Sequence, residues 1–555
     1  IQQLGLGTVE IFHTVDEQIF DGGDFRHDTT FAGAGPHAAK PMFHLGISLA
    51  KTPVLMKETT PFWFVKRNGS PYEAMSGDLT VDVLVIGGGI TGVTAAYLAG
   101  KSGSSVALVE RERLGGRDTG HTTAHLTYMT DTRLSDLIAT FSCDEAKMAW
   151  QAGQAAMEFI EGTVSDLRVD CGLQKVPGYL AAAKGKDLKH EAALLNQEAI
   201  IARSMGFEVQ YLDSDPVTSR SAIRFDNQME FHPLRYIDAL AAAAAAAGVR
   251  FFEHTEVTEF PEEGAVKTGG RSIRYKKVFI ATHVPLQGTS STLGAAMFQT
   301  KLAPYTSYAL RAEMKGRTLP RMIWSDTADP FLYLRVQRSE DGLTCILGGE
   351  DHKTGQESSA VSHYEALVND LSRVIPGAEV THCWSGQVVE TVDGLPFIGP
   401  ISETEFIATG FSGNGMTLGT AAALMFRDWL AGGNNPWTEL FDPSRRTPSA
   451  LGEYLHENKD YPVRMITGWW HVEEGDPDTI QPGAGKVLKK DGERLAVHRN
   501  QEGHLTTCSA VCPHMGCIVA WNDAERTWDC PCHGSRFKAT GEVIAGPAET
   551  DLKRC

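Results

Sequence analysis

The feature that most constrains this chain is a pair of Cys-His segments near its carboxyl end. Cys512-Pro-His514 is followed, after fifteen intervening residues, by Cys530-Pro-Cys532-His533. Thiolates and imidazoles grouped in this way are metal ligands, so the fold must bring the two segments together as loops around one centre. The sequence therefore predicts a metal-binding domain in the last hundred or so residues.

Two thiolates and two imidazoles are the ligand set of a Rieske [2Fe-2S] cluster. Cys512 and Cys530 would bind one iron and His514 and His533 the other, because neutral imidazoles remove negative charge and raise the reduction potential. Zinc is the alternative, since Cys and His pairs also form tetrahedral zinc sites. The Cys-x-His spacing, a second pair of cysteines and the Gly-Ser tail at 534–535 favour iron. A chain with such a centre transfers single electrons.

The box Cys-Pro-Cys-His-Gly-Ser at 530–535 resembles the Rieske subtype of respiratory cytochrome complexes, and the resemblance covers residues from about 465 to 555. It implies a disulfide between Cys517 and Cys532. It also implies that the Ser535 hydroxyl hydrogen-bonds a bridging sulfide, which stabilises the reduced cluster. Phe537 stands where the subtype has a tyrosine. We therefore expect a potential below the highest in that subtype.

A glycine cluster between a strand and a helix predicts a dinucleotide site. The apolar run 81–86 stops at Gly87-Gly88-Gly89, and a helical pattern begins around Gly92. Gly87 permits the turn, Gly89 lets the backbone approach a pyrophosphate, and Gly92 lets the helix pack on the strand. The amino end of the helix attracts the phosphates. A second strand ends at Glu110, which is placed to accept hydrogen bonds from ribose hydroxyls.

Two later glycine-rich segments indicate which dinucleotide binds. Residues 388–400 and 406–419 again have the pattern of strand, turn and helix. Together with the first motif they resemble the D-amino-acid oxidase and glycine oxidase superfamily of FAD enzymes. The resemblance implies that the late turn presents backbone N–H groups and a helix amino end to the flavin pyrimidine. The residues carried over on this basis are Asp393, Gly394, Gly413, Asn414, Gly415, Met416 and Thr417.

The same resemblance places five more residues at the flavin. His121 is a candidate for a covalent bond to the flavin 8α carbon, and a histidine that only hydrogen-bonds near the cofactor is the alternative. Thr122 and Thr123 are expected at the pyrophosphate. The Val257 backbone is expected at the adenine, and Ala281 at the end of a strand that closes the dinucleotide site.

The order of these motifs resembles that of FAD-dependent oxidoreductases with a fused carboxyl-terminal Rieske domain. The implied fold class is an α/β FAD-binding domain, Rossmann-like and of the glutathione-reductase type, with an α+β substrate domain and an all-β Rieske domain. The predicted boundaries are 1–60 for an amino-terminal extension, 61–440 for the oxidoreductase, 441–464 for a linker and 465–555 for the Rieske domain. Within the oxidoreductase, we expect FAD-binding segments at about 78–165, 230–300 and 385–435, and substrate or cap segments at about 166–229 and 301–384.

In this superfamily the substrate lies between a sheet and the flavin face. The candidate residues are His283, Tyr305, Tyr308, Tyr333 and Arg335. Arg335 would bind a substrate carboxylate, because its planar fork matches one. Ordinary sheet packing or a surface ion pair is the alternative for the tyrosines and the arginine, and a structural role is the alternative for His283.

The resemblance implies a dehydrogenase. It would oxidise a small amine or amino-acid-like substrate by hydride transfer to the flavin, and then pass single electrons through the cluster to an external acceptor. One alternative is a reductase in which electrons run from a carrier through the cluster to FAD. The other is a redox-responsive assembly subunit without catalytic activity.

Composition limits the partners and the compartment. A net charge of −18 argues against a nucleic-acid partner. No uncharged apolar run is long enough for a transmembrane helix. Beside the two ligand cysteines and the disulfide pair, six cysteines are scattered, and the amino end has no signal-peptide pattern, so we expect a cytoplasmic protein. Residues 1–60, whose histidines 13, 27, 37 and 44 lack ligand spacing, are expected to pack on the flavin domain or to mediate a homo-oligomer or larger assembly.

Overall fold

The computed structural model describes residues 60–185, 187–284, 301–315, 318–339, 342–357, 359–450, 452, 469, 472–548 and 550–555. The predicted amino-terminal extension, up to residue 59, and its four histidines lie outside these ranges, as does the later part of the predicted linker. Within the described part of the chain, no helix is both long and apolar enough to cross a membrane.

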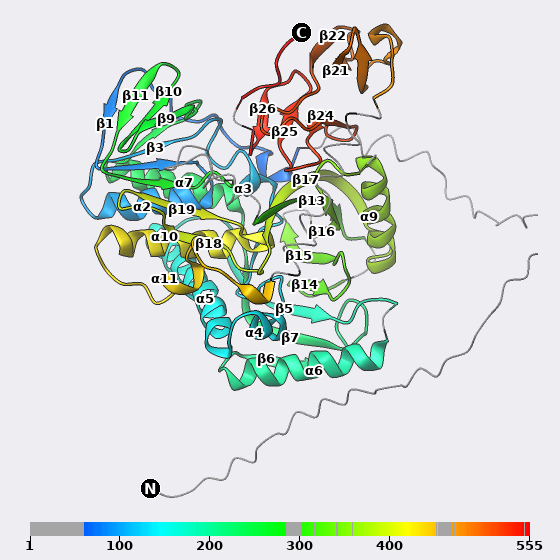
Figure 1. The fold of residues 1–555 in the computed structure, drawn as a ribbon. Coiled ribbons are helices and arrows are strands. Elements are labelled where there is room, and N and C mark those ends of the chain that lie inside the picture. Colours follow the sequence, from blue (N-terminus) through cyan, green and yellow to red (C-terminus); the bar gives the residue numbers. More distant parts are fainter. Residues whose placement is uncertain are drawn as a thin grey trace, which may run out of the picture. The chain divides into compact units, whose positions relative to one another are not determined.

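A six-stranded sheet carries the first glycine motif (Figure 1). Its order is β18-β19-β12-β2-β3-β8, and all strands are parallel except the edge strand β18. The strands are β2 (Val83–Ile86), β3 (Val106–Val109), β8 (Arg250–Phe252), β12 (Lys277–Ile280), β18 (Phe397–Pro400) and β19 (Glu405–Thr409). Every residue of β2 and β3 is buried, as expected for parallel strands that are covered on both faces.

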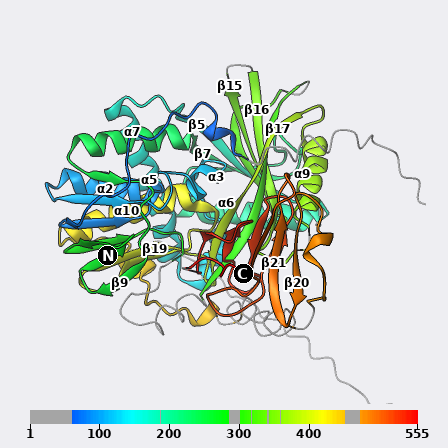
Figure 2. The same cartoon turned by 90° about the horizontal axis from the view of Figure 1, so that it is seen from above.

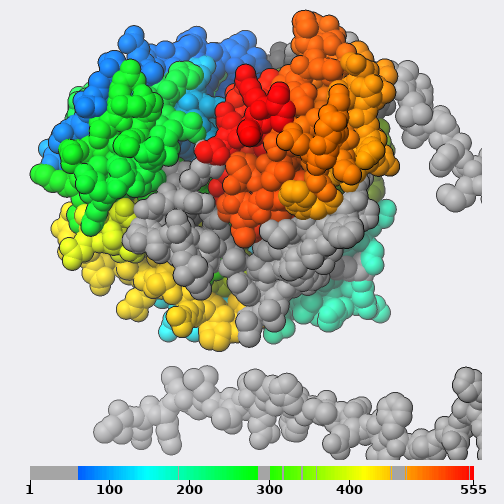
Figure 3. Space-filling model, turned by 45° about the horizontal axis from the view of Figure 1, so that its top comes forward, coloured from blue at the N-terminus to red at the C-terminus, as the bar shows by residue number. Residues whose placement is uncertain are grey.

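The two faces of this sheet bury different cores. Val83 and Val85 of β2 pack against helices, whereas Leu84 and Ile86 pack against a small sheet of order β1-β11-β10-β9. The helices are α2 (Ile90–Lys101), α5 (Cys143–Leu167), α7 (Pro233–Ala246) and α10 (Gly415–Leu430). The small sheet consists of β1 (Leu79–Thr80), β9 (Glu259–Glu262), β10 (Ala265–Thr268) and β11 (Arg271–Arg274). In Figure 3 the green residues of this part of the chain lie against blue residues from its earlier part.

A larger, nine-stranded sheet has the order β17-β13-β16-β15-β14-β5-β7-β4, with β6 paired to β7. Its neighbours are antiparallel except β14 and β5. Helix α9 (Ala360–Val374) covers one face of β13 and β16 (Figure 2). The strands are β4 (His125–Leu126), β5 (Gln174–Ala181), β6 (Val209–Leu212), β7 (Ala222–Glu230), β13 (Leu302–Glu313), β14 (Met322–Asp326), β15 (Tyr333–Ser339), β16 (Gly342–Lys353) and β17 (Glu379–Thr391).

Further helices stand between the strands along the chain. Helix α6 joins β5 to β6 within the nine-stranded sheet and begins at the capping residue Asp187, whose carboxylate accepts the N–H groups of Lys189 and His190. The further helices are α3 (Asp118–His121), α4 (Leu134–Thr140), α6 (Leu188–Ser204) and α11 (Thr438–Phe441), with 3-10 turns at η2 (Phe62–Phe64), η3 (Ser412–Asn414) and η4 (Pro448–Ala450).

Among the residues described from 472 onward, the carboxyl-terminal region contains strands and one short 3-10 turn, η5 (Pro477–Thr479). It forms a three-stranded antiparallel sheet and a four-stranded antiparallel sheet. The strands are β20 (Gly485–Lys490), β21 (Glu493–Arg499), β22 (Leu505–Ser509), β23 (Ala520–Asn522), β24 (Thr527–Asp529), β25 (Arg536–Lys538) and β26 (Val543–Ala545). Their shared core includes Trp528, Phe537 and the cysteines of both Cys-His segments.

Candidate active site and cluster-binding loops

A cavity of about 520 Å³ collects most of the residues that the glycine motifs predicted. One side of its lining comes from the turn after β2 and from the start of α10, where the backbone is exposed by glycine residues. We call this side, residues 87–89 and 412–416, the backbone wall. The other side comes from the nine-stranded sheet, and we call Ser307, Tyr333 and Asp351 the side-chain wall.

The first half of the backbone wall has no room for side chains. Gly87 has a φ of 107°, and a Cβ there would overlap the carbonyl oxygen of Ala281. A Cβ on Gly92, which does not line the cavity, would overlap the carbonyl oxygen of Gly87. Gly92 therefore sets how closely α2 approaches the turn, and the amino end of α2 opens on the cavity at Gly89 and Ile90.

Glu110 follows β3 and lies beside the glycine turn. Its carboxylate accepts the backbone N–H of Gly88 at 2.6 Å and that of Glu112 at 2.8 Å. Burial raises the pKa of Glu110 above its ordinary value, and the two backbone N–H groups counter this in part. The acid that the sequence placed at a ribose thus lines the cavity at the end of the expected strand.

The second half of the backbone wall is the start of α10. The Asn414 side chain donates to the carbonyl of Met129 at 2.8 Å and accepts the N–H of Asp131 at 3.1 Å, which ties this turn to the loop after β4. The Gly413 N–H donates to the Asp131 carboxylate at 2.6 Å. Two helix amino ends, of α2 and α10, therefore face one cavity, and both favour negative charge there.

The other predicted flavin residues divide into two groups. Those that line the cavity are His121, Thr122, Thr123, Val257 and Ala281. Asp393, Gly394 and Thr417 do not line it. The carboxylate of Asp393 is bound by Arg445 at 2.7 Å, and the Thr417 hydroxyl donates to the carbonyl of Thr127 at 2.9 Å. In the structure these residues hold the segments around the turn.

His121 is fixed by its neighbours at the cavity edge. Its Nδ1 lies 3.0 Å from the carbonyl oxygen of Arg117, and its own carbonyl accepts the indole N–H of Trp384 at 2.8 Å. Because a carbonyl can only accept, Nδ1 carries the proton and a neutral ring keeps its lone pair on Nε2.

The side-chain wall contains a short chain of polar groups. The hydroxyls of Tyr333 and Ser307 lie 2.6 Å apart, and Asp351 stands next to Ser307. Burial raises the pKa of Asp351 to about 7, and hydrogen bonding from Ser307 opposes that shift. Asp131 is the second buried carboxyl that lines the cavity, and burial raises its pKa to about 6.

His125 completes the polar lining near Tyr333, with the two ring centroids 5.9 Å apart. Burial lowers the pKa of His125 to about 3, so this ring is neutral at ordinary pH. The sequence interpretation missed Asp131, His125, Ser307 and Asp351. Only Asp351 carried a signal, because the two glycines 348 and 349 interrupt an apolar run just before Glu350-Asp351, and glycine inside a strand indicates a bulge.

Arg335 is not at the predicted place. It does not line the cavity but is buried, with its Nε 3.2 Å from a carboxylate oxygen of Glu230. Its Nη1 donates to the carbonyls of Thr123 and Ala124 at 3.1 and 3.0 Å. The guanidinium thus binds a carboxylate of the protein itself, that of Glu230, and not one of a substrate. Through its hydrogen bonds to the backbone, Arg335 holds the segment that bears Thr123.

Of the three predicted substrate tyrosines, Tyr333 alone lines the cavity. Tyr308 is fully buried on the α9 side of the sheet, where its hydroxyl lies 3.0 Å from His352 Nε2 and its ring stacks on His363. Tyr305 does not line the cavity either, whereas Tyr333 does. Because side chains alternate along a strand, Tyr308 points away from the face on which Ser307 lies.

His283 lines the cavity, but beside the backbone wall and not on the nine-stranded sheet. It follows β12 with a φ of 67°, and its Nδ1 lies 3.5 Å from a carboxylate oxygen of Asp118. The hydroxyl of Thr409 donates to its carbonyl at 2.5 Å. This position follows Ala281, whose carbonyl oxygen lies against the glycine turn at Gly87.

The two Cys-His segments form matching loops. The Cys512 carbonyl accepts the N–H of Gly516 at 3.0 Å, and the Cys530 carbonyl accepts that of Gly534 at 2.9 Å. Both cysteines are buried outside any disulfide, and their thiols hydrogen-bond to each other. The loops therefore present the expected thiols at one point.

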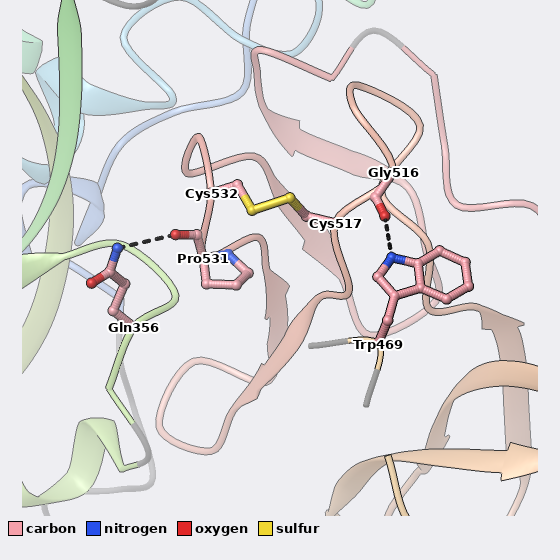
Figure 4. The surroundings of a disulfide bond; sticks show 6 residues. All are labelled: Gln356, Trp469, Gly516, Cys517, Pro531 and Cys532. Atoms are coloured by element: carbon pink, nitrogen blue, oxygen red, sulfur yellow. Dashed lines mark hydrogen bonds between the residues drawn. A yellow bond between two sulfur atoms is a disulfide. The ribbon is translucent and has the colours of Figure 1, made fainter. Parts of the chain in front are cut away.

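The two imidazoles and the second cysteine pair complete this centre. The His514 and His533 rings lie 4.8 Å apart at 89°. Cys517 and Cys532 are joined by a disulfide that ties the two loops together (Figure 4). The sulfur atoms of Cys517, Cys530 and Cys532 also lie within 4.8 Å of one another, but the disulfide leaves only Cys530 able to bind a metal.

The cluster-binding loops contact the nine-stranded sheet. Gln387 of β17, which is 5% exposed and lines the cavity, donates its amide N–H to the carbonyl of Gly534 at 2.9 Å. Gln356 donates to the carbonyl of Pro531 at 3.1 Å (Figure 4). Residues 544–548 and Arg536 of the carboxyl-terminal region also line the cavity. The loop that bears His533 therefore lies next to the cavity lining.

The residues present fit the two implied cofactors. A cradle that a Cβ would fill, two helix amino ends and an acid at the end of β3 suit the phosphates and ribose of FAD. Two buried thiols and two facing imidazoles from two disulfide-linked loops suit a [2Fe-2S] cluster.

Comparison with known families matches two regions of the chain. Residues 82–429 match the DAO model, described as FAD dependent oxidoreductase. Residues 471–555 match the Rieske [2Fe-2S] domain. These matches confirm the predicted fold class and both predicted cofactors.

Individual relatives show the same division. YhfW of Bacillus subtilis (strain 168), named for a Rieske 2Fe-2S iron-sulfur protein, is 32% identical over 502 residues, which cover 89% of this chain and 97% of that protein. The cytochrome b6-f complex iron-sulfur subunit of Chlorobaculum thiosulfatiphilum is 39% identical over 93 residues, 17% of this chain and 51% of that protein. The crystal structure of glycine oxidase from Geobacillus kaustophilus, at 20% identity, has a TM-score of 0.56 and covers 66% of this chain and 99% of that chain, which shows a shared fold.

Proposed function

Because the chain belongs to the family of FAD dependent oxidoreductases and carries a carboxyl-terminal Rieske [2Fe-2S] domain, we propose that it is a dehydrogenase with an internal electron relay. Its substrate is a small amine or amino-acid-like molecule, and its electrons leave through the cluster to an external acceptor. When bound, FAD supplies a two-electron acceptor for the substrate hydride and the cluster supplies a one-electron carrier.

The proposal assigns the holding roles as follows. The backbone wall and the amino ends of α2 and α10 bind the anionic parts of FAD, and Glu110 binds a ribose. His121, Thr122, Thr123, Val257 and Ala281 border it along the cavity. Asp393, Gly394 and Thr417 support the turn from behind. The cluster ligands are Cys512, His514, Cys530 and His533.

One contact carries the proposal of a relay. Gln387 of β17 belongs to the cavity lining, and its side chain donates a hydrogen bond to the carbonyl of Gly534, the residue after His533. One residue of this strand therefore lies between the cavity and the cluster-binding loop. His533 would be the ligand on the entry side. His514 would be on the exit side, because it precedes Met515, which is 50% exposed.

The experiment that tests this proposal is anaerobic mixing with a panel of small amines and amino acids. Loss of flavin absorbance, followed by the EPR signal of the reduced cluster, is the expected result. If only dithionite or a reduced carrier bleaches the flavin, the dehydrogenase is wrong and the chain is either the reductase or the assembly subunit described above.

We also propose that His121 bonds covalently to the flavin 8α carbon. The Nδ1–H donated to the Arg117 carbonyl leaves Nε2 with the lone pair that such a bond needs. The parent protein should then keep its flavin in the pellet on acid precipitation, and His121→Ala should release it into the supernatant. Flavin released from the parent contradicts the covalent bond.

The domain boundaries given above, a cytoplasmic location and an external electron carrier as partner are part of the same proposal. The location is supported by the cysteines outside the cluster loops, which are thiols in the structure. Whether residues 1–60 mediate assembly stays a prediction.

A further inference from the structure

We propose that Asp351 recognises the substrate nitrogen, and that the site takes a protonated alkylamine with no need for a carboxylate beside it. The inference rests on the proposed dehydrogenase function and narrows its substrate class. It depends on where a bulge in β16 places Asp351 and on the groups that surround that carboxylate. It also depends on Arg335, which is paired with Glu230 and so does not bind a substrate carboxylate.

A bulge turns Asp351 toward the cavity. Strands β13 and β16 pair Thr306 with His352 and Tyr308 with Gly349, so Glu350 and Asp351 both stand opposite Ser307. Gly349 and Glu350 have φ values of 147° and 59°, which marks the same break in the strand.

The bulge separates two neighbouring carboxylates. Glu350 lies on the α9 side, where its carboxylate is 3.4 Å from His363 Nδ1, while Asp351 lines the cavity. A Cβ on Gly348 would meet the Tyr333 ring, so Gly348 faces the cavity side, and regular alternation along the strand would have placed Glu350 on that side instead. The extra residue therefore has a consequence for function, because it decides which acid faces the substrate.

One oxygen of Asp351 is available to a ligand. Its Oδ1 is buried and has no hydrogen-bond partner among the residues that the structure describes. A buried carboxylate oxygen without a donor is costly, so a donor is expected to arrive with the substrate. An ammonium group, which has only donors, fits this position.

The charges around Asp351 also favour a cation. Asp131 is a second carboxyl in the same lining, and His125 and Tyr333 are neutral there at ordinary pH. Each arginine of the lining already forms an ion pair with an acid of the protein. The pairs are Arg111 with Glu256, Arg117 with Glu112, Arg133 with Glu191, and Arg536 with Glu525 and Asp529, and Arg111 also donates to the Ile544 carbonyl.

The chemistry of amine oxidation gives Asp351 a second task. The ammonium form must lose a proton before its carbon can release a hydride. The Asp351 carboxylate accepts that proton from nitrogen, which leaves a neutral amine and a carboxylic acid. The C–H bond next to nitrogen then breaks with its electron pair, the pair goes with the hydrogen to FAD, and an iminium ion remains. Burial, which holds the pKa of Asp351 near 7, suits a group that accepts a proton at neutral pH.

Binding of a probe that cannot react tests the proposal without turnover. Tert-butylamine has no C–H next to nitrogen, and pivalate has the same shape with a carboxylate in place of the ammonium group. Calorimetric titration of the FAD-loaded parent protein should show binding of tert-butylamine and none of pivalate. Asp351→Asn should weaken tert-butylamine on the order of tenfold or more, because one charge-assisted hydrogen bond is lost.

Glu350→Gln is the matched control, since it removes one carboxylate from the same strand on the opposite face. It should bind tert-butylamine as the parent does. The proposal is overturned if pivalate binds as tightly as the amine, or if Asp351→Asn, with FAD and cluster retained, binds the amine like the parent. Should Asp351→Asn fail to fold, the comparison of the two probes on the parent still decides.

Isopropylamine, which has the missing C–H, separates this inference from the proposed function. If the parent binds tert-butylamine but no oxidisable amine bleaches its flavin, the proposed dehydrogenase activity is wrong, while the proposal that Asp351 binds an amine is kept. If isopropylamine bleaches the flavin equally well in the parent and in Asp351→Asn, the dehydrogenase stands and the role of Asp351 is wrong.

Discussion

The two walls of the cavity bind by different means. The backbone wall offers N–H groups and helix ends, and its glycines Gly87 and Gly413 pack so closely on Ala281 and Asp131 that a Cβ would overlap these neighbours. The side-chain wall offers a carboxylate and hydroxyls from three strands, β13, β15 and β16. A wall made of backbone can be recognised in a short stretch of sequence, whereas a wall made of side chains depends on strand pairing over long distances.

The largest expected effect is on the backbone wall. A Cβ at Gly92 would overlap the Gly87 carbonyl, so Gly92→Ala should displace the glycine turn and abolish FAD binding. The flavin content of the purified protein measures this, and the cluster's absorption should persist because its loops lie in another sheet region.

Gly162→Ala in α5 serves as its control, because nothing lies within 4 Å of a Cβ there. It should keep its full flavin content. A Gly92→Ala protein that also keeps full flavin content would mean that the turn after β2 does not hold the cofactor.

The second effect separates the backbone wall from the cluster. Cys530→Ser should remove the visible absorption and EPR signal of the cluster and leave FAD in place, because the thiolate binds iron and touches no residue of the backbone wall. Cys508→Ser, at a buried thiol of the same region that hydrogen-bonds the Thr540 carbonyl, should retain both signals. Zinc in the parent protein, found by metal analysis, would contradict the assignment.

A smaller effect is expected where the cavity lining meets the cluster loop. Gln387→Leu removes the hydrogen bond to Gly534, so electron transfer from flavin to cluster should slow several-fold while both cofactors remain bound. Rapid-mixing absorbance measures the two phases. Gln356→Ala is the matched control, because Gln356 donates a similar hydrogen bond to the Pro531 carbonyl but does not line the cavity. It should change the rate of electron transfer from flavin to cluster less than Gln387→Leu does. Equal effects of the two substitutions would show that Gln387 has no special place in the path.

The smallest effect is the pH dependence of amine binding at the side-chain wall. Because burial raises the pKa of Asp351 to about 7, its carboxylate forms as pH rises through that value, and affinity for tert-butylammonium should rise several-fold with it. Asp131, with its raised pKa of about 6, is already ionised over most of this range, and His125 and Tyr333 stay neutral. Glu350 faces the other side of the sheet.

The rise should be absent from Asp351→Asn when calorimetric titrations are repeated across the same pH range. An equal rise in that variant would assign the titration to another group.

The comparison also explains which residues the sequence could predict. Gly87, Gly92, Glu110 and the cluster ligands belong to short motifs in which spacing alone fixes the geometry. The disulfide between Cys517 and Cys532 was implied by the resemblance of the 530–535 box to a Rieske subtype, and the structure contains it. For these residues, neighbours in sequence are neighbours in space.

The substrate side could not be predicted in this way. Arg335 had the right chemistry for a carboxylate, but Glu230, more than a hundred residues away, occupies it. Tyr308 differs from Ser307 only in strand phase, which depends on pairing with β16 and β17. Asp351 reaches the cavity through a bulge at which the two preceding glycines hint, but its position is fixed only by the pairing of β16 with β13.

The central claim is that one chain moves electrons from an amine through FAD to its own cluster. The most direct measurement is an anaerobic titration with an oxidisable amine, followed by flavin absorbance and cluster EPR. Because the cluster takes one electron in addition to the two taken by FAD, the parent should consume about 1.5 times as much amine as Cys530→Ser before its flavin is fully bleached. Its cluster signal should grow with each addition. Equal uptake by both proteins, with the parent's cluster still oxidised at the end point, would contradict the relay.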